Sequence, residues 1–160
     1  MSPIAHRWVV LALFVLVCFG IAGLGSIATA SSIGQWYAEL RKPAWTPPGW
    51  IFGPVWTALY AAMAVAAWLV WVRVGWPAAK GALGLFALQL ILNAGWSWLF
   101  FGLRNPGAAA IEIVVLWVSI LLTLLAFWRA APPAGWLMVP YLAWVTFATA
   151  LNIAIWKLNP

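Results

Sequence analysis

The chain alternates long apolar runs with short polar interruptions. Each of the five apolar runs is close to the roughly 20 residues that an α-helix needs to cross about 30 Å of hydrocarbon. Three of the four connections are short, so successive helices are expected to run antiparallel as neighbours. Only the first connection, residues 28–46, is long. The predicted helices span residues 7–27, 47–73, 78–103, 106–129 and 134–157.

Proline and its neighbours set the predicted helix boundaries. Thr46 before Pro47, and Asn105 before Pro106, are both typical of a helix start. The capping side chain accepts a free backbone N–H, and proline needs no donor at the first helical position. The remaining breaks lie in the glycine- and proline-containing stretches 73–77 and 129–135.

Composition places this pattern in a membrane. Of the 160 residues, 67% are hydrophobic and only 6% are charged, and the mean hydropathy is +1.02. A soluble globular domain carries roughly 25% charged residues. The expected fold class is therefore an all-α integral membrane protein, with residues 1–160 forming one domain, a five-transmembrane-helix bundle. The orientation and the membrane of residence stay open, because equal numbers of cations flank the two ends of the predicted bundle.

The first apolar run also imitates a secretory signal. His6-Arg7 precedes it, and Ala28-Thr29-Ala30 offers a small-residue cleavage site. The run from Trp8 to Ile27 is longer than the roughly 7–15 residues of a signal's apolar core. We therefore expect a retained helix.

Charge and residue types exclude several classes of function. The net charge is +6, but the cations are scattered singly and form no stripe that could follow a phosphate backbone, so no nucleic-acid partner is expected. One cysteine, Cys18, and one histidine, His6, provide neither a disulfide nor a metal cluster. Glu39 and Glu112 are far apart in sequence and form no close pair of carboxylates. No catalytic residue, metal or cofactor is predicted.

Polar side chains recur at helical spacing inside the predicted helices. Gln89, Asn93 and Ser97 form one stripe on the third helix. Amides are costly in hydrocarbon, so this stripe faces the bundle and bonds either a neighbouring helix or a ligand. Glu112, near the start of the fourth helix, is explained either structurally, by the helix dipole and Arg104, or by a functional role.

Tryptophans also occur deep in the predicted helices. An indole N–H needs a partner in a low-dielectric setting, so a deep tryptophan more often faces protein or ligand than lipid. Trp56 aligns with Tyr60 on the second helix, and Trp144 aligns with Tyr141 and Ala148 on the fifth. Core packing alone would also explain these stripes. The mid-helix tryptophans are Trp56, Trp96, Trp98, Trp117 and Trp144.

The long first connection is rich in aromatic residues and proline. Trp36-Tyr37 precede the run from Lys42 to Trp50, which reads KPAWTPPGW. Two interpretations stay open: an interfacial loop whose indoles lie among lipid headgroups, and a lid over a cavity. As a lid, it would place Trp45 and Trp50 over a flat aromatic ligand.

Taken together, these blocks resemble the translocator protein family, also called tryptophan-rich sensory proteins or peripheral benzodiazepine receptors. The resemblance extends in order over almost the whole chain. It rests on Trp36-Tyr37, the run from Lys42 to Trp50, Trp56, Asn93 and the stretch from Pro140 to Asn152.

The resemblance implies a five-helix bundle, often dimeric, whose cavity lies on the side of the first loop. That cavity would bind tetrapyrroles such as protoporphyrin IX, and synthetic isoquinoline carboxamide or benzodiazepine drugs. By the same resemblance, its lining would include Tyr37, Trp56, Asn93, Trp144 and Ala148.

The predicted function is a membrane-embedded binding protein or transporter for porphyrin-like ligands. Trp56 and Trp144 would be the stacking walls and Asn93 the polar anchor. One alternative is an enzyme that degrades porphyrin in light through the same indoles, and another is a sensor or scaffold that acts through partner proteins. The resemblance leaves the choice between transport, sensing and degradation open.

The remaining expected partners are membrane lipid and a second copy of the chain. Two small-residue patches compete as the dimer contact. One comprises Gly81, Gly84 and Ala87, and the other Gly20, Gly23 and Gly25. A sterol is weakly supported, because Ile153 stands where the sterol-recognition pattern of the fifth helix requires tyrosine.

Overall fold

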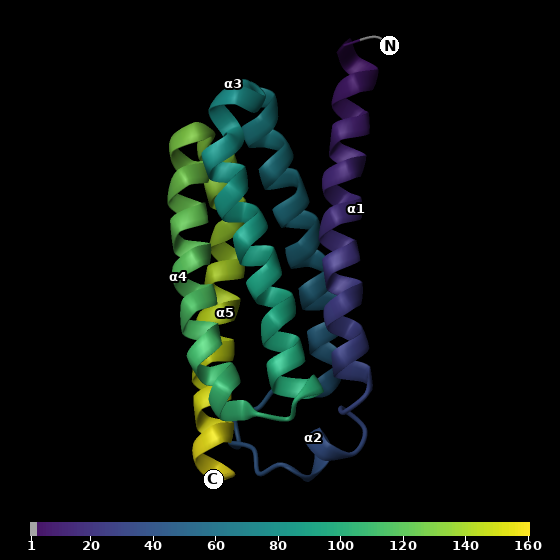
Figure 1. Ribbon diagram of the computed structural model, residues 1–160, viewed down its shortest axis with the longest axis vertical. Coiled ribbons are helices and arrows are strands. Elements are labelled where there is room, and N and C mark those ends of the chain that lie inside the picture. The colour runs from purple at the N-terminus through teal and green to yellow at the C-terminus, as the bar shows by residue number, and fades with distance from the viewer. Residues whose placement is uncertain (1–2) are drawn as a thin grey trace.

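The computed structural model describes residues 3–160, and no strand occurs within that range. Residues 1 and 2 of the predicted domain lie outside it. Figure 1 shows the long helices side by side, with the two termini at opposite ends of the bundle. The long helices are α1 (Pro3–Ala30), α3 (Phe52–Ser97), α4 (Pro106–Ala130) and α5 (Pro132–Leu158). Shorter elements are α2 (Trp36–Glu39), the 3-10 helix η1 (Gly49–Ile51) and the π-helix η2 (Trp98–Gly102).

Helix α3 is a hairpin of two arms (Figure 1). The chain reverses at Gly75, whose φ of 71° and ψ of 166° belong to a region that only glycine occupies without strain. Pro77 follows in the first turn of the second arm, where its missing N–H is not needed. The first arm comprises residues 52–74 and the second arm residues 76–97. The second and third predicted helices thus correspond to these arms, joined by a tighter turn than the sequence suggested.

The predicted helix start at residue 47 is wrong. The Thr46 hydroxyl donates to the carbonyl of Pro43 at 2.7 Å instead of capping a helix, and α3 begins only at Phe52. Pro47 stands directly before Pro48, a position where the proline ring disfavours helical backbone. Pro48 itself is extended, with φ of −57° and ψ of 140°. Two successive prolines therefore delay the helix.

The other proline-based boundaries hold. The side chain of Asn105 accepts a hydrogen bond from the backbone N–H of Ala108 at 2.9 Å, and Pro106 opens α4 as predicted. Helix α5 starts at Pro132, slightly before the expected residue 134, because proline is favoured in the first helical turn. Only Ala131 separates α4 from α5.

The core lies among the two arms of α3, α4 and α5. Its fully buried side chains include Met63, Val70, Ile120, Phe127, Met138 and Val145. Helix α1 adds the buried Cys18 but leaves many apolar side chains exposed. Within residues 3–160, four helices are long and apolar enough to cross a membrane. The stretch Gly49–Gly102, which contains α3, has 54 residues and is roughly twice the length of one crossing.

The connection between α1 and α3 folds across one end of the bundle (Figure 1). We call residues 31–48 the capping loop; the sequence predicted it at 28–46. The hydroxyl of Ser32 donates to the carbonyl of Phe101 at 2.7 Å. The side-chain amide of Asn159 accepts from the N–H of Arg41 at 3.0 Å and donates to its carbonyl at 2.9 Å. These contacts hold the loop against η2 and the end of α5.

Candidate ligand cavity

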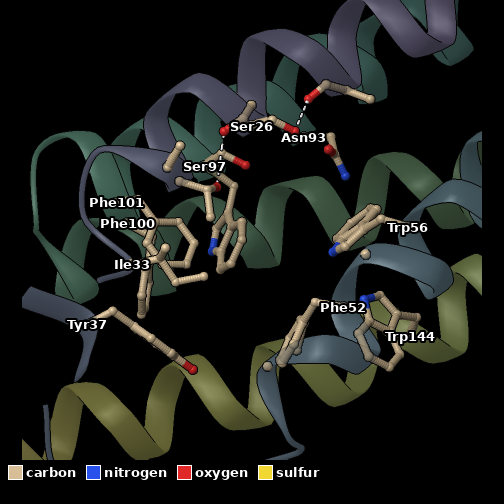
Figure 2. A pocket seen from close by; sticks show the side chains of 18 of the residues that line it. Ser26, Ile33, Tyr37, Phe52, Trp56, Asn93, Ser97, Phe100, Phe101 and Trp144 are labelled. Carbon is tan, nitrogen blue, oxygen red and sulfur yellow. Dashed lines mark hydrogen bonds between the residues drawn. The ribbon is translucent and has the colours of Figure 1, made fainter. Parts of the chain in front are cut away.

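A cavity of about 750 Å³ lies at the capping-loop end of the bundle. It is bordered by α1, both arms of α3, η2, α5 and the capping loop, and its size falls within the roughly 300–1,000 Å³ typical of small-molecule sites. Figure 2 shows its aromatic side chains in two groups. Phe52, Trp56 and Trp144 lie on one side, and Tyr37, Phe100 and Phe101 lie on the other.

The first aromatic group is built from the first arm of α3 and from α5. Phe52 lies one helical turn before Trp56, so both present to the same face. The ring of Phe52 meets Trp144 edge-on with centroids 5.7 Å apart. Trp56 in turn contacts Tyr141 edge-on at 6.2 Å. These contacts fix the orientation of the two indoles that border the cavity.

A chain of buried hydrogen bonds supports the cavity beside Trp56. The Tyr60 hydroxyl donates to Asn93 Oδ1 at 2.6 Å, and Asn93 Nδ2 donates to the Tyr141 hydroxyl at 2.9 Å. Tyr141 then donates to Gln89 Oε1 at 2.9 Å. The predicted amide stripe thus bonds neighbouring helices, while Asn93 also borders the cavity. Because a carboxamide has two N–H groups and two acceptor positions, these bonds leave one of each unused on Asn93.

A second set of bonds joins the helices at the loop end. Trp96 Nε1 donates to Asn152 Oδ1 at 2.9 Å, and Asn152 Nδ2 donates to the carbonyl of Pro106 at 2.8 Å. The indole of Trp96 is also stacked on Phe100, with ring centroids 5.3 Å apart. Through Trp96, the second aromatic group is therefore connected to α4 and α5.

The capping loop supplies Tyr37 and Lys42 to the cavity. The Tyr37 ring packs on Phe101 with centroids 5.5 Å apart, and the ammonium of Lys42 lies 4.7 Å from its centroid. Burial raises the pKa of Tyr37 above its ordinary value. Its hydroxyl therefore stays protonated at neutral pH and can donate a hydrogen bond.

The cavity is open between α1 and the first arm of α3. The lining residues there are small and exposed: Gly23 and Ser26 on α1, and Gly53 and Thr57 on the first arm. A Cβ atom placed at Gly23 or Gly53 would meet nothing within 4 Å. Besides the side that the capping loop covers, the cavity therefore has a side that side chains do not close. We call this side the lateral opening.

The structure separates the predicted site residues into two groups. Trp45 and Trp50 lie outside the lining and are 50% and 75% exposed. Trp45 packs edge-on against Phe147 with ring centroids 5.7 Å apart. Contact of Trp45 and Trp50 with a ligand stays a prediction. The five that border the cavity are Tyr37, Trp56, Asn93, Trp144 and Ala148.

Lys42, Phe52, Phe100 and the α1 residues also line the cavity, although they were not among the predicted site residues. Helical spacing could have found two of them, since Phe52 precedes Trp56 and Phe100 follows Trp96 by four positions. No comparable signal marks α1, which is apolar almost throughout. Lys42 lies in an irregular loop, where spacing does not predict the direction of a side chain.

The mid-helix tryptophans do not all face inward. Trp117 Nε1 donates to the Thr146 hydroxyl at 2.7 Å, as expected for a deep indole. Trp98, by contrast, is 46% exposed. The N–H of Trp98 still bonds the carbonyl of Ala94, so Trp98 keeps the α-helical register and continues the outward face of Ile91, which is 64% exposed.

Glu112 lies outside the cavity lining. Both of its carboxyl oxygens are buried and have no hydrogen-bond partner among residues 3–160, so the expected pairing with Arg104 is not formed. The carboxyl group faces the second arm of α3, where a Cβ at Gly95 would lie 3.9 Å from Oε1. Glu112 is therefore not assigned a role at the cavity.

Fold and cavity together define an all-helical bundle of membrane-length apolar helices around an aromatic pocket that a loop covers at one end. The model of the TspO/MBR family matches residues 14–157, so the chain belongs to that family. This confirms the resemblance drawn from the tryptophan- and proline-rich segments.

Relatives from distant organisms match most of the chain. The "Tryptophan-rich protein TspO" of Chlorobaculum tepidum is 46% identical over 152 residues, covering 94% of this chain and 96% of the relative. The human "Translocator protein" is 42% identical over 127 residues, covering 78% of this chain and 75% of the relative. The "Tryptophan-rich sensory protein" of Cereibacter sphaeroides is 37% identical over 153 residues, covering 95% and 92% respectively.

Proposed function

We propose that this protein is a multi-pass membrane protein whose cavity binds tetrapyrroles such as protoporphyrin IX, and that it serves their binding or transport. The observation that carries the proposal is the cavity of about 750 Å³ between two groups of aromatic side chains. A flat, apolar macrocycle gains from burial against indole and phenyl rings on both of its faces.

The outer surface supports insertion in a bilayer. One face of α4 exposes a continuous row of aliphatic side chains, including Ile111 at 70% and Val115 at 53% exposure. Leu122 continues the row further along the helix. In water such a face would be costly, whereas lipid tails solvate it well.

The lateral opening supports exchange of ligands with the bilayer. A porphyrin-like molecule partitions into lipid, and the exposed lining residues Gly23 and Gly53 lie where lipid would contact the bundle. The cavity would also accept other flat hydrophobic molecules, including isoquinoline carboxamide and benzodiazepine drugs. The same opening would serve a binding protein and a transporter alike.

A homodimer is part of the proposal. Gly81, Gly84 and Ala87 are exposed along the second arm of α3, where small side chains allow close helix approach. On α1, by contrast, Gly25 is buried, and a Cβ there would lie 3.1 Å from Ser97 Oγ. The second arm is therefore the better of the two predicted contact patches.

Titration of the purified protein with protoporphyrin IX tests the function. We expect saturable binding, followed through porphyrin fluorescence, that Trp144→Leu weakens about tenfold or more because an indole in the wall is lost. Trp136→Leu is the matched control, since Trp136 lies on the same helix, is 61% exposed and does not line the cavity. Equal binding by wild type and empty micelles, or equal losses in both variants, would refute the proposal.

A further inference from the structure

Among the described residues that line the cavity, Lys42 carries the one charged side chain. The rest of the lining is aromatic, aliphatic, glycine or neutral polar, and contains no carboxylate. Lys42 is half-buried at the loop side, next to Tyr37. A full positive charge at the edge of an otherwise neutral, apolar site is costly unless it meets an anion or polar partners.

The ammonium of Lys42 is held by neutral groups. It donates to the carbonyls of Ala38 at 3.2 Å and Leu40 at 3.1 Å, and it lies 4.7 Å from the centroid of the Tyr37 ring. Among residues 3–160 it forms no ion pair with a carboxylate, although the exposed Glu39 lies in the same loop. An ammonium has three N–H donors, so two are used and one remains.

A second donor lies beside it. The Tyr37 hydroxyl borders the cavity and makes no hydrogen bond within the described part of the chain. The loop that carries both side chains is fixed by the paired bonds between Arg41 and Asn159. Lys42 and Tyr37 are thus positioned side by side at the cavity before a ligand arrives, and each has a donor that these bonds leave unused.

We infer that Lys42, assisted by Tyr37, is the anion-recognition residue of the cavity, and that the site selects flat hydrophobic ligands with a carboxylate on the edge that faces the capping loop. The inference rests on the proposed function and adds the charge and the orientation of the ligand. The macrocycle would lie between the aromatic groups, and its acidic side chain would reach the ammonium. Charge-assisted hydrogen bonds of this kind are the strong ones in partly desolvated sites.

The test compares two ligands with the same macrocycle: protoporphyrin IX, with two carboxylates, and its dimethyl ester, in which two methyl groups replace the two charges. Both are titrated into the full chain and into Lys42→Gln, Lys42→Arg and Arg41→Gln. Arg41→Gln is the matched control, because Arg41 is the neighbouring cation, is exposed and does not line the cavity. Comparing variants for each ligand separately removes the different partitioning of the two ligands into detergent.

We expect Lys42→Gln to lower the affinity for the diacid about tenfold and to leave the affinity for the ester within about twofold. Lys42→Arg should retain most of the affinity for the diacid, and Arg41→Gln should behave as wild type. Added salt should weaken diacid binding in wild type more than in Lys42→Gln, since the variant lacks the screened charge.

Two results would overturn the inference while leaving the proposed function intact. One is unchanged diacid affinity in Lys42→Gln. The other is an equal loss of affinity for diacid and ester, which would show that Lys42 only maintains the conformation of the loop. If wild type binds neither ligand saturably, the proposed function fails, and the inference about Lys42 fails with it.

Discussion

Arg41 and Asn159 are 118 positions apart in the sequence, yet two hydrogen bonds join them. The side-chain amide of Asn159 accepts from the backbone N–H of Arg41 and donates to its carbonyl, as a neighbouring strand would. A further bond from the same amide to the carbonyl of Ile155, at 2.8 Å, fixes its orientation. The end of α5 therefore holds the capping loop across the cavity.

Asn159→Ala should loosen the capping loop without altering the helical walls of the cavity. Losing two partly exposed hydrogen bonds, each worth about 0.5–1.5 kcal/mol, should raise the population of the open loop about tenfold. Hydrogen exchange of residues 38–46 should become faster, while exchange in the two arms of α3 stays unchanged. Lys157→Ala is the control, because Lys157 is exposed in the last turn of the same helix. Unchanged exchange in the loop would show that other contacts hold it.

The buried bonds of Asn93 should couple it energetically to Tyr60. Tyr60→Phe leaves Asn93 Oδ1 without its donor and should cost about 1 kcal/mol of stability. Asn93→Leu removes the partners of both Tyr60 and Tyr141 and should cost about 2 kcal/mol. The double variant should lose about 1 kcal/mol less stability than the sum of the two single losses, because both substitutions break the same bond between Tyr60 and Asn93.

Reversible unfolding in mixed micelles measures these differences. Thr57→Val serves as the control, since the exposed Thr57 hydroxyl bonds only the carbonyl of Gly53 in its own helix, at 2.9 Å. It should change stability by less than about 0.5 kcal/mol. Strictly additive effects of Tyr60→Phe and Asn93→Leu would mean that the bond between them contributes nothing measurable.

A large side chain at Gly53 should slow binding of protoporphyrin IX. Gly53 borders the lateral opening, and space for a side chain exists there, so Gly53→Trp should obstruct the path rather than fill the cavity. The association rate in stopped-flow mixing should fall about tenfold, and the dissociation rate should fall with it, since both use one path. Gly20→Trp is the matched control: Gly20 is an equally open glycine of α1 that does not line the cavity. Unchanged rates in Gly53→Trp would indicate that ligands pass through the capping loop instead.

Gly135 should tolerate no side chain. Only Ala131 separates α4 from α5, and a Cβ at Gly135 would lie 2.9 Å from Trp128 Cα and 2.8 Å from its Cβ. Backbone atoms cannot move aside as a side chain can, so Gly135→Ala should lower stability by about 2 kcal/mol. Gly20→Ala, at an open mid-helix site of α1, should instead leave stability unchanged or raise it by up to about 1 kcal/mol, because alanine is the better helix former. Equal thermal stability of the two variants would contradict the tight approach of α4 to α5.

Much of the fold could be predicted because apolar length and local capping chemistry act within a few residues. Asn105 and Pro106 set the start of α4 through bonds confined to one turn. The amide stripe of Gln89 and Asn93 was expected to face inward, because unpaired amides are costly in hydrocarbon, and both side chains are buried.

What could not be predicted depends on contacts distant in the sequence or on irregular backbone. The direction of Lys42 into the cavity, with Trp45 and Trp50 outside it, follows from where Asn159 holds the loop. No periodic sequence pattern indicates which side chains of an irregular loop point into a cavity.

The central claim is that the pocket beside Trp56 and Trp144 holds a planar guest. An experimental structure of the protein with protoporphyrin IX bound tests it most directly. We predict a macrocycle enclosed between Trp56 and Trp144 on one side and Phe100 and Phe101 on the other. A porphyrin seated on the outer, lipid-facing surface, with the pocket unchanged, would contradict it.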